Sequence, residues 1–94
     1  MRVRWLRAAL ANLEAEAEYI AEENPAAAGR VVQRIFRAVD ILKKNPAMGR
    51  AGRVPGTREL VVGETPYILP YRVRGDVVEI LRVFHAARKW PGKF

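Results

Sequence analysis

The sequence predicts an α+β fold in which an antiparallel sheet packs against an antiparallel helical hairpin, in the order β-α-α-β-β-β. Three observations lead to this expectation. A short alternating segment opens the chain, two long segments with helical spacing of apolar residues follow, and three β-rich segments separated by turn residues complete it. This arrangement would bury every apolar stripe. The 94 residues suffice for one such domain, residues 1–94.

The first two elements are a strand and a helix. Val3 and Trp5 alternate with Arg2 and Arg4, a pattern typical of a strand with one side turned inward. We expect this strand to join the edge of the C-terminal meander. The following segment predicts an amphipathic helix that ends near Glu23, because apolar residues recur there at steps of three and four. Its apolar stripe is Leu6, Leu10, Leu13, Ala17 and Ile20.

A second helix is predicted to start at Asn24-Pro25. Asn can cap backbone amides at a helix start, and Pro at the first helical position gives up an amide that lacks a partner anyway. The helix should end near Asn45-Pro46, and so short a connection to the first helix predicts an antiparallel hairpin. Its apolar stripe is Ala28, Val31, Val32, Ile35, Val39 and Leu42.

The C-terminal half reads as a loop followed by a three-stranded meander. Residues 46–56 contain three glycines and two prolines, which predicts a surface loop without regular structure. The segments TRELVVG, YILPYRVR and VVEILRVF then predict three strands, with ETP as the turn between the first two.

The turn between the last two strands also predicts their register. Gly75-Asp76 suits a two-residue hairpin loop, so Arg74 should face Val77, with one apolar sheet face and a cross-strand ion pair on the other. Pro70 cannot donate to a ladder, so we expect a bulge or a non-bonded position there. The further expected pairs are Tyr71 with Ile80, Val73 with Val78, Tyr67 with Phe84, and Arg72 with Glu79.

Composition narrows the function classes. The formal charge is +7, from 17 Lys and Arg against 10 Asp and Glu, which favours a polyanion or an acidic partner. With no cysteine and one histidine, we expect neither a disulfide framework nor a metal site, and no cofactor. The glycines of the 46–56 loop follow a helix and lack a Gly-Lys-Ser/Thr ending, so they do not form a nucleotide-binding loop. No apolar run could span a bilayer, so we expect a cytoplasmic protein without membrane contact.

His85 is the serious candidate for chemistry. An imidazole among arginines is what acid/base cleavage of an RNA phosphodiester would need, and the arginines could stabilise the phosphate. The alternative is that His85 ends a strand and hydrogen-bonds the backbone.

Four other residues are candidates for contact with a partner or ligand. Arg50, Arg53 and Arg58 could form a clamp for phosphate or carboxylate, or could be ordinary surface arginines. Trp90 could stack on a base, although the Pro91-Gly92 that follows favours a role in anchoring the tail.

The chain resembles toxins of bacterial toxin-antitoxin modules in the RelE/ParE superfamily. The resemblance rests on YIAEENPAAAGRVVQRI, NPAMGRAGRVPGTREL, PYILPYRV and DVVEILRVFHAAR, in that order, and it covers nearly the whole chain. The ending LRVFHAAR is similar to the Leu-His-X-X-Arg ending common among ParE-like members. The lysine-rich active-site segment of RelE itself is absent.

The resemblance implies growth arrest by one of two routes. ParE-like members inhibit DNA gyrase, whereas RelE-like members cleave messenger RNA on the ribosome without metal. The ending favours the first. Arg58, His85 and Arg88 match positions where some ribonuclease members place functional groups, and a toxin-like binding module without activity is a third possibility. The expected contacts with the target are Arg50, Arg53, Arg58, Arg82, His85, Arg88 and Trp90.

The resemblance also implies partners. A cognate antitoxin, often with an acidic segment that folds on contact, should neutralise the toxin. Operator DNA should be bound only through that antitoxin.

Overall fold

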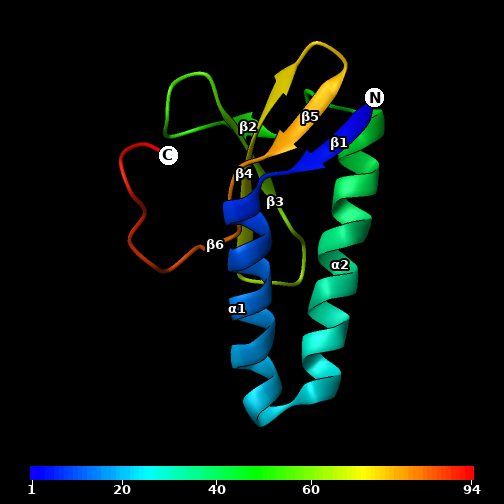
Figure 1. Cartoon of the computed structure of the whole chain (residues 1–94), viewed down its shortest axis with the longest axis vertical. Helices are drawn as coiled ribbons and strands as arrows, with labels where there is room; N and C mark the ends of the chain where they lie inside the picture. Colours follow the sequence, from blue (N-terminus) through cyan, green and yellow to red (C-terminus); the bar gives the residue numbers. More distant parts are fainter.

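The computed structural model describes residues 1–94 and contains two helices and six strands (Figure 1). The fold is α+β, as predicted. The helical hairpin lies against one face of the sheet and extends well beyond it (Figure 1). The elements are β1 (Arg2–Trp5), α1 (Arg7–Glu23), α2 (Pro25–Lys44), β2 (Arg50–Ala51), β3 (Arg58–Val61), β4 (Tyr67–Arg74), β5 (Val77–Ile80) and β6 (Phe84–His85).

The helix boundaries follow from local signals. The Asn24 side chain accepts a hydrogen bond from the Ala27 amide at 3.1 Å, which confirms the predicted cap of α2. Ile35, Val39 and Leu42 of the predicted α2 stripe lie in the core shared with the sheet, and Val31 and Val32 pack against that core. On α1 the expectation for Leu10 was wrong, because 49% of this residue is exposed while Ala9 is fully buried. Ala9 therefore takes the place expected for Leu10 in the buried stripe, while Leu13 is buried as predicted.

The core between the helices and the sheet is apolar throughout. Tyr71, Leu69 and Ile80 from the sheet and Ile35 and Leu42 from α2 are completely buried. Burial at roughly 25 cal/mol per Å² of apolar surface is the main force that holds the helical hairpin on the sheet. The sheet residues of this core are Leu60, Val62, Tyr67, Leu69, Tyr71, Val78, Ile80 and Val83.

The sheet order is β1-β5-β4-β3-β2, with β6 pairing with β4. β1 lies at the edge beside β5, as expected, but it runs parallel to β5, so the sheet is mixed and the prediction of a wholly antiparallel sheet was wrong. Val3 pairs with Val78 and Trp5 with Ile80. The alternation of apolar and polar residues indicates which side of β1 is buried, but a parallel and an antiparallel β1 satisfy it equally well. The direction of β1 depends instead on how the helices that follow it pack on the sheet.

Two further expectations for the C-terminal half need correction. The segment 46–56 is not entirely irregular, because Arg50 and Ala51 form β2 and pair with Glu59 and Arg58 of β3. The predicted last strand is divided into β5 and β6. Tyr67 consequently pairs with His85 and not with Phe84.

The division is a bulge opposite Pro70, where one was expected. Pairing runs to Tyr71 with Ile80 and resumes at Ile68 with Phe84, so the β5–β6 side contains one more residue than β4 between these pairs. The Pro70 carbonyl accepts a bond from the Leu81 amide at 2.9 Å, and Pro70 has no amide to return. The other hairpin pairs are those predicted, and Gly75 takes a positive φ of 58° at the turn.

The second face of the sheet is also covered. Ile68, Pro70 and Leu81 lie on it and are buried. The C-terminal tail, residues 86–94, and the loop 52–57 lie on the same side of the molecule, away from α2 (Figure 1). Neither helix is both long enough and apolar enough to cross a bilayer.

Candidate functional site

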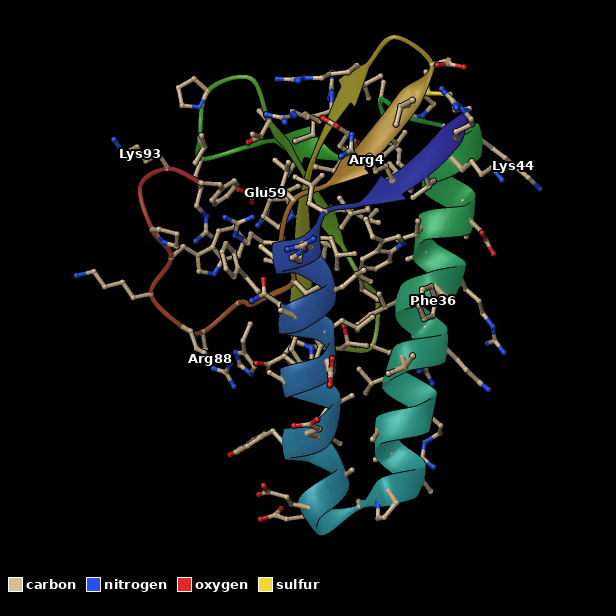
Figure 2. All side chains as sticks on the ribbon, viewed as in Figure 1. Arg4, Phe36, Lys44, Glu59, Arg88 and Lys93 are labelled. Carbon is tan, nitrogen blue, oxygen red and sulfur yellow. The ribbon has the colours of Figure 1, made fainter.

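Two buried carboxylates organise the arginines of the second sheet face. Glu59 is only 3% exposed and contacts two of the predicted residues. Its Oε1 lies 3.0 Å from Nη2 of Arg50, and its Oε2 accepts the Arg53 amide at 2.9 Å. Figure 2 shows Glu59 enclosed by neighbouring side chains. Arg50 and Arg53 are thus brought together, as the predicted clamp requires. The carboxylate that they bind, however, is that of Glu59 in the same chain.

Glu79 gathers a second group. It accepts a hydrogen bond from Nε of Arg72 at 2.7 Å, and Arg74 and Arg4 lie 3.6 and 3.8 Å away. The bond from Arg72 and the charges of the three guanidinium groups hold the pKa of Glu79 below its ordinary value of 4.5, against the opposing effect of desolvation. The predicted Arg72–Glu79 ion pair is confirmed. Arg74 and Arg4 were not among the predicted site residues.

The tail docks through aromatic contacts. The Trp90 ring packs against Phe84 at 4.9 Å and lies 3.7 Å from the Arg53 guanidinium carbon, while its Nε1 donates to the His85 carbonyl at 3.1 Å. The anchoring role of Trp90 is confirmed. Arg82 donates to the Leu81 carbonyl at 2.6 Å, and its guanidinium faces the Phe94 ring at 5.6 Å.

Arg58 is separated from Arg50 and Arg53, so the structure does not assemble the expected clamp of three arginines. It directly follows Thr57 and precedes Glu59, and alternation along β3 turns it to the helix side of the sheet. Its Nη1 donates to the carbonyls of Ala47 at 3.2 Å and Gly49 at 2.9 Å. Arg58 therefore holds the connection after α2.

His85 and Arg88 belong to another group, beside α1. The His85 ring meets the Tyr67 ring edge-on at 5.7 Å, and its Nδ1 accepts the Ala87 amide at 3.1 Å. Tyr67 donates to Oε1 of Glu16 at 2.9 Å, and Arg88 donates to Oε2 at 2.6 Å. Burial, followed by the hydrogen bond and charge of Glu16, raises the pKa of Tyr67 to about 12.

The sheet register separates two of the three ribonuclease candidates along the sheet. Arg58 pairs with Tyr71 and His85 with Tyr67, on opposite sides of β4. Four residues of strand separate these positions by roughly 13 Å along the sheet. The two side chains also contact different partners, because Arg58 donates to the carbonyls of Ala47 and Gly49 while His85 packs against the Tyr67 ring. No group of three or more His, Asp or Glu side chains is placed to hold a metal ion.

Comparison with known proteins agrees with this architecture. Residues 3–90 match the ParE toxin family, described as the ParE toxin of the type II toxin-antitoxin system, parDE. The chain is 52% identical over 90 residues to Y4kP of Sinorhizobium fredii, covering 96% of this chain and 93% of that protein. It is 41% identical over 87 residues to toxin RelE2 of Caulobacter vibrioides, covering 93% and 97% of the two chains.

A solved structure from the chromosomal ParDE toxin-antitoxin system of P. aeruginosa superposes with a TM-score of 0.83 at 34% identity, covering 90% of this chain and 95% of that one. Sequence and backbone thus lead to the same assignment. The chain belongs to the ParE toxin family of type II toxin-antitoxin systems.

Proposed function

We propose that this toxin arrests growth by inhibiting DNA gyrase through protein contact. The carrying observation is the separation of Arg58 from His85 by four residues along β4, on opposite strands. A metal-independent nuclease needs its acid, base and phosphate-stabilising groups around one phosphate. Inhibition by contact needs only a complementary surface, and the second sheet face with its tail offers Arg53, Arg82 and Trp90 for that purpose.

The direct experiment measures supercoiling by purified gyrase while the full-length toxin is titrated in. We expect supercoiling to fall as the toxin saturates. Arg53→Gln with Arg82→Gln should weaken the inhibition, and Arg30→Gln with Arg37→Gln removes the same charge from exposed positions of α2 as a control. Undiminished supercoiling at saturating toxin would refute the proposal.

The second candidate is ribosome-dependent cleavage of messenger RNA, and the observation that favours it is the likeness to a protein named RelE2. In that case His85 would act as acid or base. His85→Ala should then abolish message cleavage and relieve growth arrest, whereas a gyrase inhibitor should leave messages intact in both the wild type and the variant.

The proposed partner is a cognate antitoxin. The solved relative comes from a ParDE toxin-antitoxin system, and the helices of this chain expose large apolar residues that its own sheet leaves uncovered. Among them, Leu10 is 49% exposed, Phe36 44% and Ile41 53%. Co-expression should yield a complex that survives purification. Leu10→Asp with Ile41→Asp should weaken it while the toxin remains folded.

A further inference from the structure

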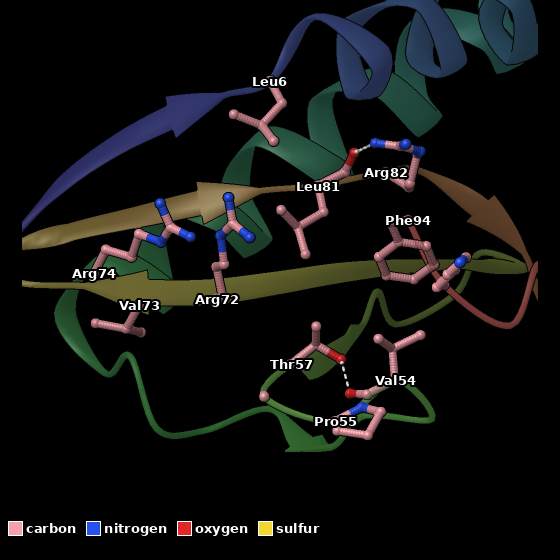
Figure 3. Close-up of a pocket in the computed structure, with 12 residues that line it drawn as sticks. Leu6, Val54, Pro55, Thr57, Arg72, Val73, Arg74, Leu81, Arg82 and Phe94 are labelled. Carbon is pink, nitrogen blue, oxygen red and sulfur yellow. Dashed lines mark hydrogen bonds between the residues drawn. The ribbon is translucent and has the colours of Figure 1, made fainter.

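A basic cavity opens between the second sheet face, the loop 54–57 and the end of the tail (Figure 3). Its volume is about 580 Å³, within the usual range for small-molecule sites in proteins. Four cationic side chains line it: Arg72, Arg74, Arg82 and Lys93. No carboxylate is among the lining residues.

The arginines on β4 are held with their outer nitrogens available. Glu79, which is only 6% exposed, accepts a hydrogen bond from Nε of Arg72 at 2.7 Å and forms an ion pair with Arg74, whose Nε lies 3.6 Å away. The terminal Nη atoms of both arginines make no intramolecular hydrogen bond. A guanidinium that is fixed at Nε presents its remaining donors in a planar fork suited to phosphate oxygens. Figure 3 shows the two guanidinium groups side by side above β4.

The other two cations are less restrained. Arg82 donates from Nη1 to the Leu81 carbonyl and has no acidic partner, and Lys93 forms neither a hydrogen bond nor an ion pair. Glu79 pairs with Arg72, Arg74 and Arg4 but not with Arg82 or Lys93, so the cavity keeps a local surplus of positive charge. Because like charges repel at short range, this arrangement is stabilised by a ligand with several negative charges.

Apart from Thr57, the rest of the cavity wall is formed by glycine and apolar residues. Leu6, Leu81, Val54 and the Phe94 ring line it, next to the Arg82 guanidinium (Figure 3). The volume is far larger than an inorganic anion requires. An aromatic ring beside a cluster of cationic side chains suits a nucleotide, because the base can stack on the ring while the cations bind the phosphates.

We propose that this cavity binds a nucleotide, with its phosphates on Arg72, Arg74, Arg82 and Lys93 and its base against Phe94 and Leu81. Recognition would use side-chain cations and no glycine-rich phosphate loop. The same chemistry can come from a free nucleoside triphosphate or from a single-stranded nucleic acid. Arg82 belongs both to this site and to the surface proposed to contact gyrase, so binding is measured on the toxin alone, where the result does not depend on inhibition of gyrase.

The test measures the affinity of the full-length toxin for ATP, for inorganic triphosphate and for a short single-stranded oligonucleotide. We expect Arg82→Gln with Lys93→Gln to weaken ATP binding by about tenfold or more, because two charge-assisted contacts are lost. Arg30→Gln with Arg37→Gln removes the same charge from α2 and should leave the affinity within about twofold, since those residues lie outside the cavity. Equal losses in both double variants would overturn the site in favour of unspecific attraction.

Phe94→Ala tests the base. This substitution should lower the affinity for ATP by about fivefold or more and leave the affinity for inorganic triphosphate unchanged, because only the stacking contact is removed. Equal affinity for ATP and triphosphate in the wild type would overturn the nucleotide assignment. ATP binding tighter than oligonucleotide binding identifies a free nucleotide as the source, and the reverse order identifies a nucleic-acid strand; no saturable binding of either contradicts the proposal.

Discussion

Buried carboxylates set the arrangement of charge at the residue scale. Glu59 and Glu79 are nearly inaccessible, yet every buried side-chain polar atom has a hydrogen-bond partner. An unpaired carboxylate in such a position would be strongly destabilising, so the surrounding arginines are required by the fold. This explains why Arg50 and Arg72 are tied to the sheet. Cations without such a carboxylate, such as Lys93, remain available for other contacts.

Tyr67 gives a prediction that depends on pH. Its pKa is raised from 10.0 to about 12 in the folded protein, so the unfolded chain loses this proton first as the pH rises. The resulting stability is fully present below pH 10 and is lost between pH 10 and about 12. In Tyr67→Phe, the free energy of unfolding should fall less steeply over this pH range. At neutral pH it should be lower by about 1 kcal/mol, because the hydrogen bond to Glu16 is lost.

The measurement is urea unfolding of the wild type and the variant across this pH range. Tyr19→Phe is the matched control, because 66% of Tyr19 is exposed. An identical alkaline decline in the wild type and Tyr67→Phe would show that Tyr67 does not carry this effect.

At the scale of elements, the loop requires glycine at position 52, whereas α2 does not require it at position 29. A Cβ on Gly52 would lie 2.1 Å from Oγ1 of Thr57 and 2.7 Å from its carbonyl oxygen, and the Gly52 amide bonds that same carbonyl at 2.9 Å. Only glycine fits such a close approach. On α2, nothing lies within 4 Å of a Cβ built on Gly29.

Alanine at these two positions should therefore change stability in opposite directions. Gly52→Ala should destabilise the protein by about 1 to 3 kcal/mol, because backbone must move to admit the methyl group. Gly29→Ala should stabilise it by about 0.5 to 1 kcal/mol through helix propensity. Denaturant unfolding measures both, and a Gly52→Ala variant as stable as the wild type would contradict the close approach.

At the scale of the whole molecule, both faces of the sheet are covered, but one cover is packed more extensively than the other. The helical hairpin covers one with a continuous apolar core, whereas the tail covers the other through Trp90 and Phe94, which pack against Phe84 of β6. The tail also shapes the basic cavity, since Lys93 and Phe94 line it. Folding of the tail and formation of the cavity are therefore linked.

Removing the anchor of the tail should loosen this side of the molecule alone. Trp90→Ala should cost about 1 to 2 kcal/mol, less than truncation of a fully buried tryptophan. Hydrogen exchange should accelerate at the Ala86 and Arg88 amides, which now donate to Pro66 and His85, while the amides of α1 stay protected. Lys89→Ala should leave exchange unchanged. Undisturbed exchange at Ala86 and Arg88 in Trp90→Ala would contradict the anchoring role.

The sequence by itself determined the helical hairpin, the β4–β5 register and the Arg72–Glu79 pair. These depend on periodicity, a cap and a two-residue turn, which act over a few neighbouring residues. Only the tertiary structure decided the parallel direction of β1, the turn of Arg58 to the helix side and the Arg88–Glu16 pair across 72 residues. Such contacts depend on where whole elements pack, and no local pattern encodes that.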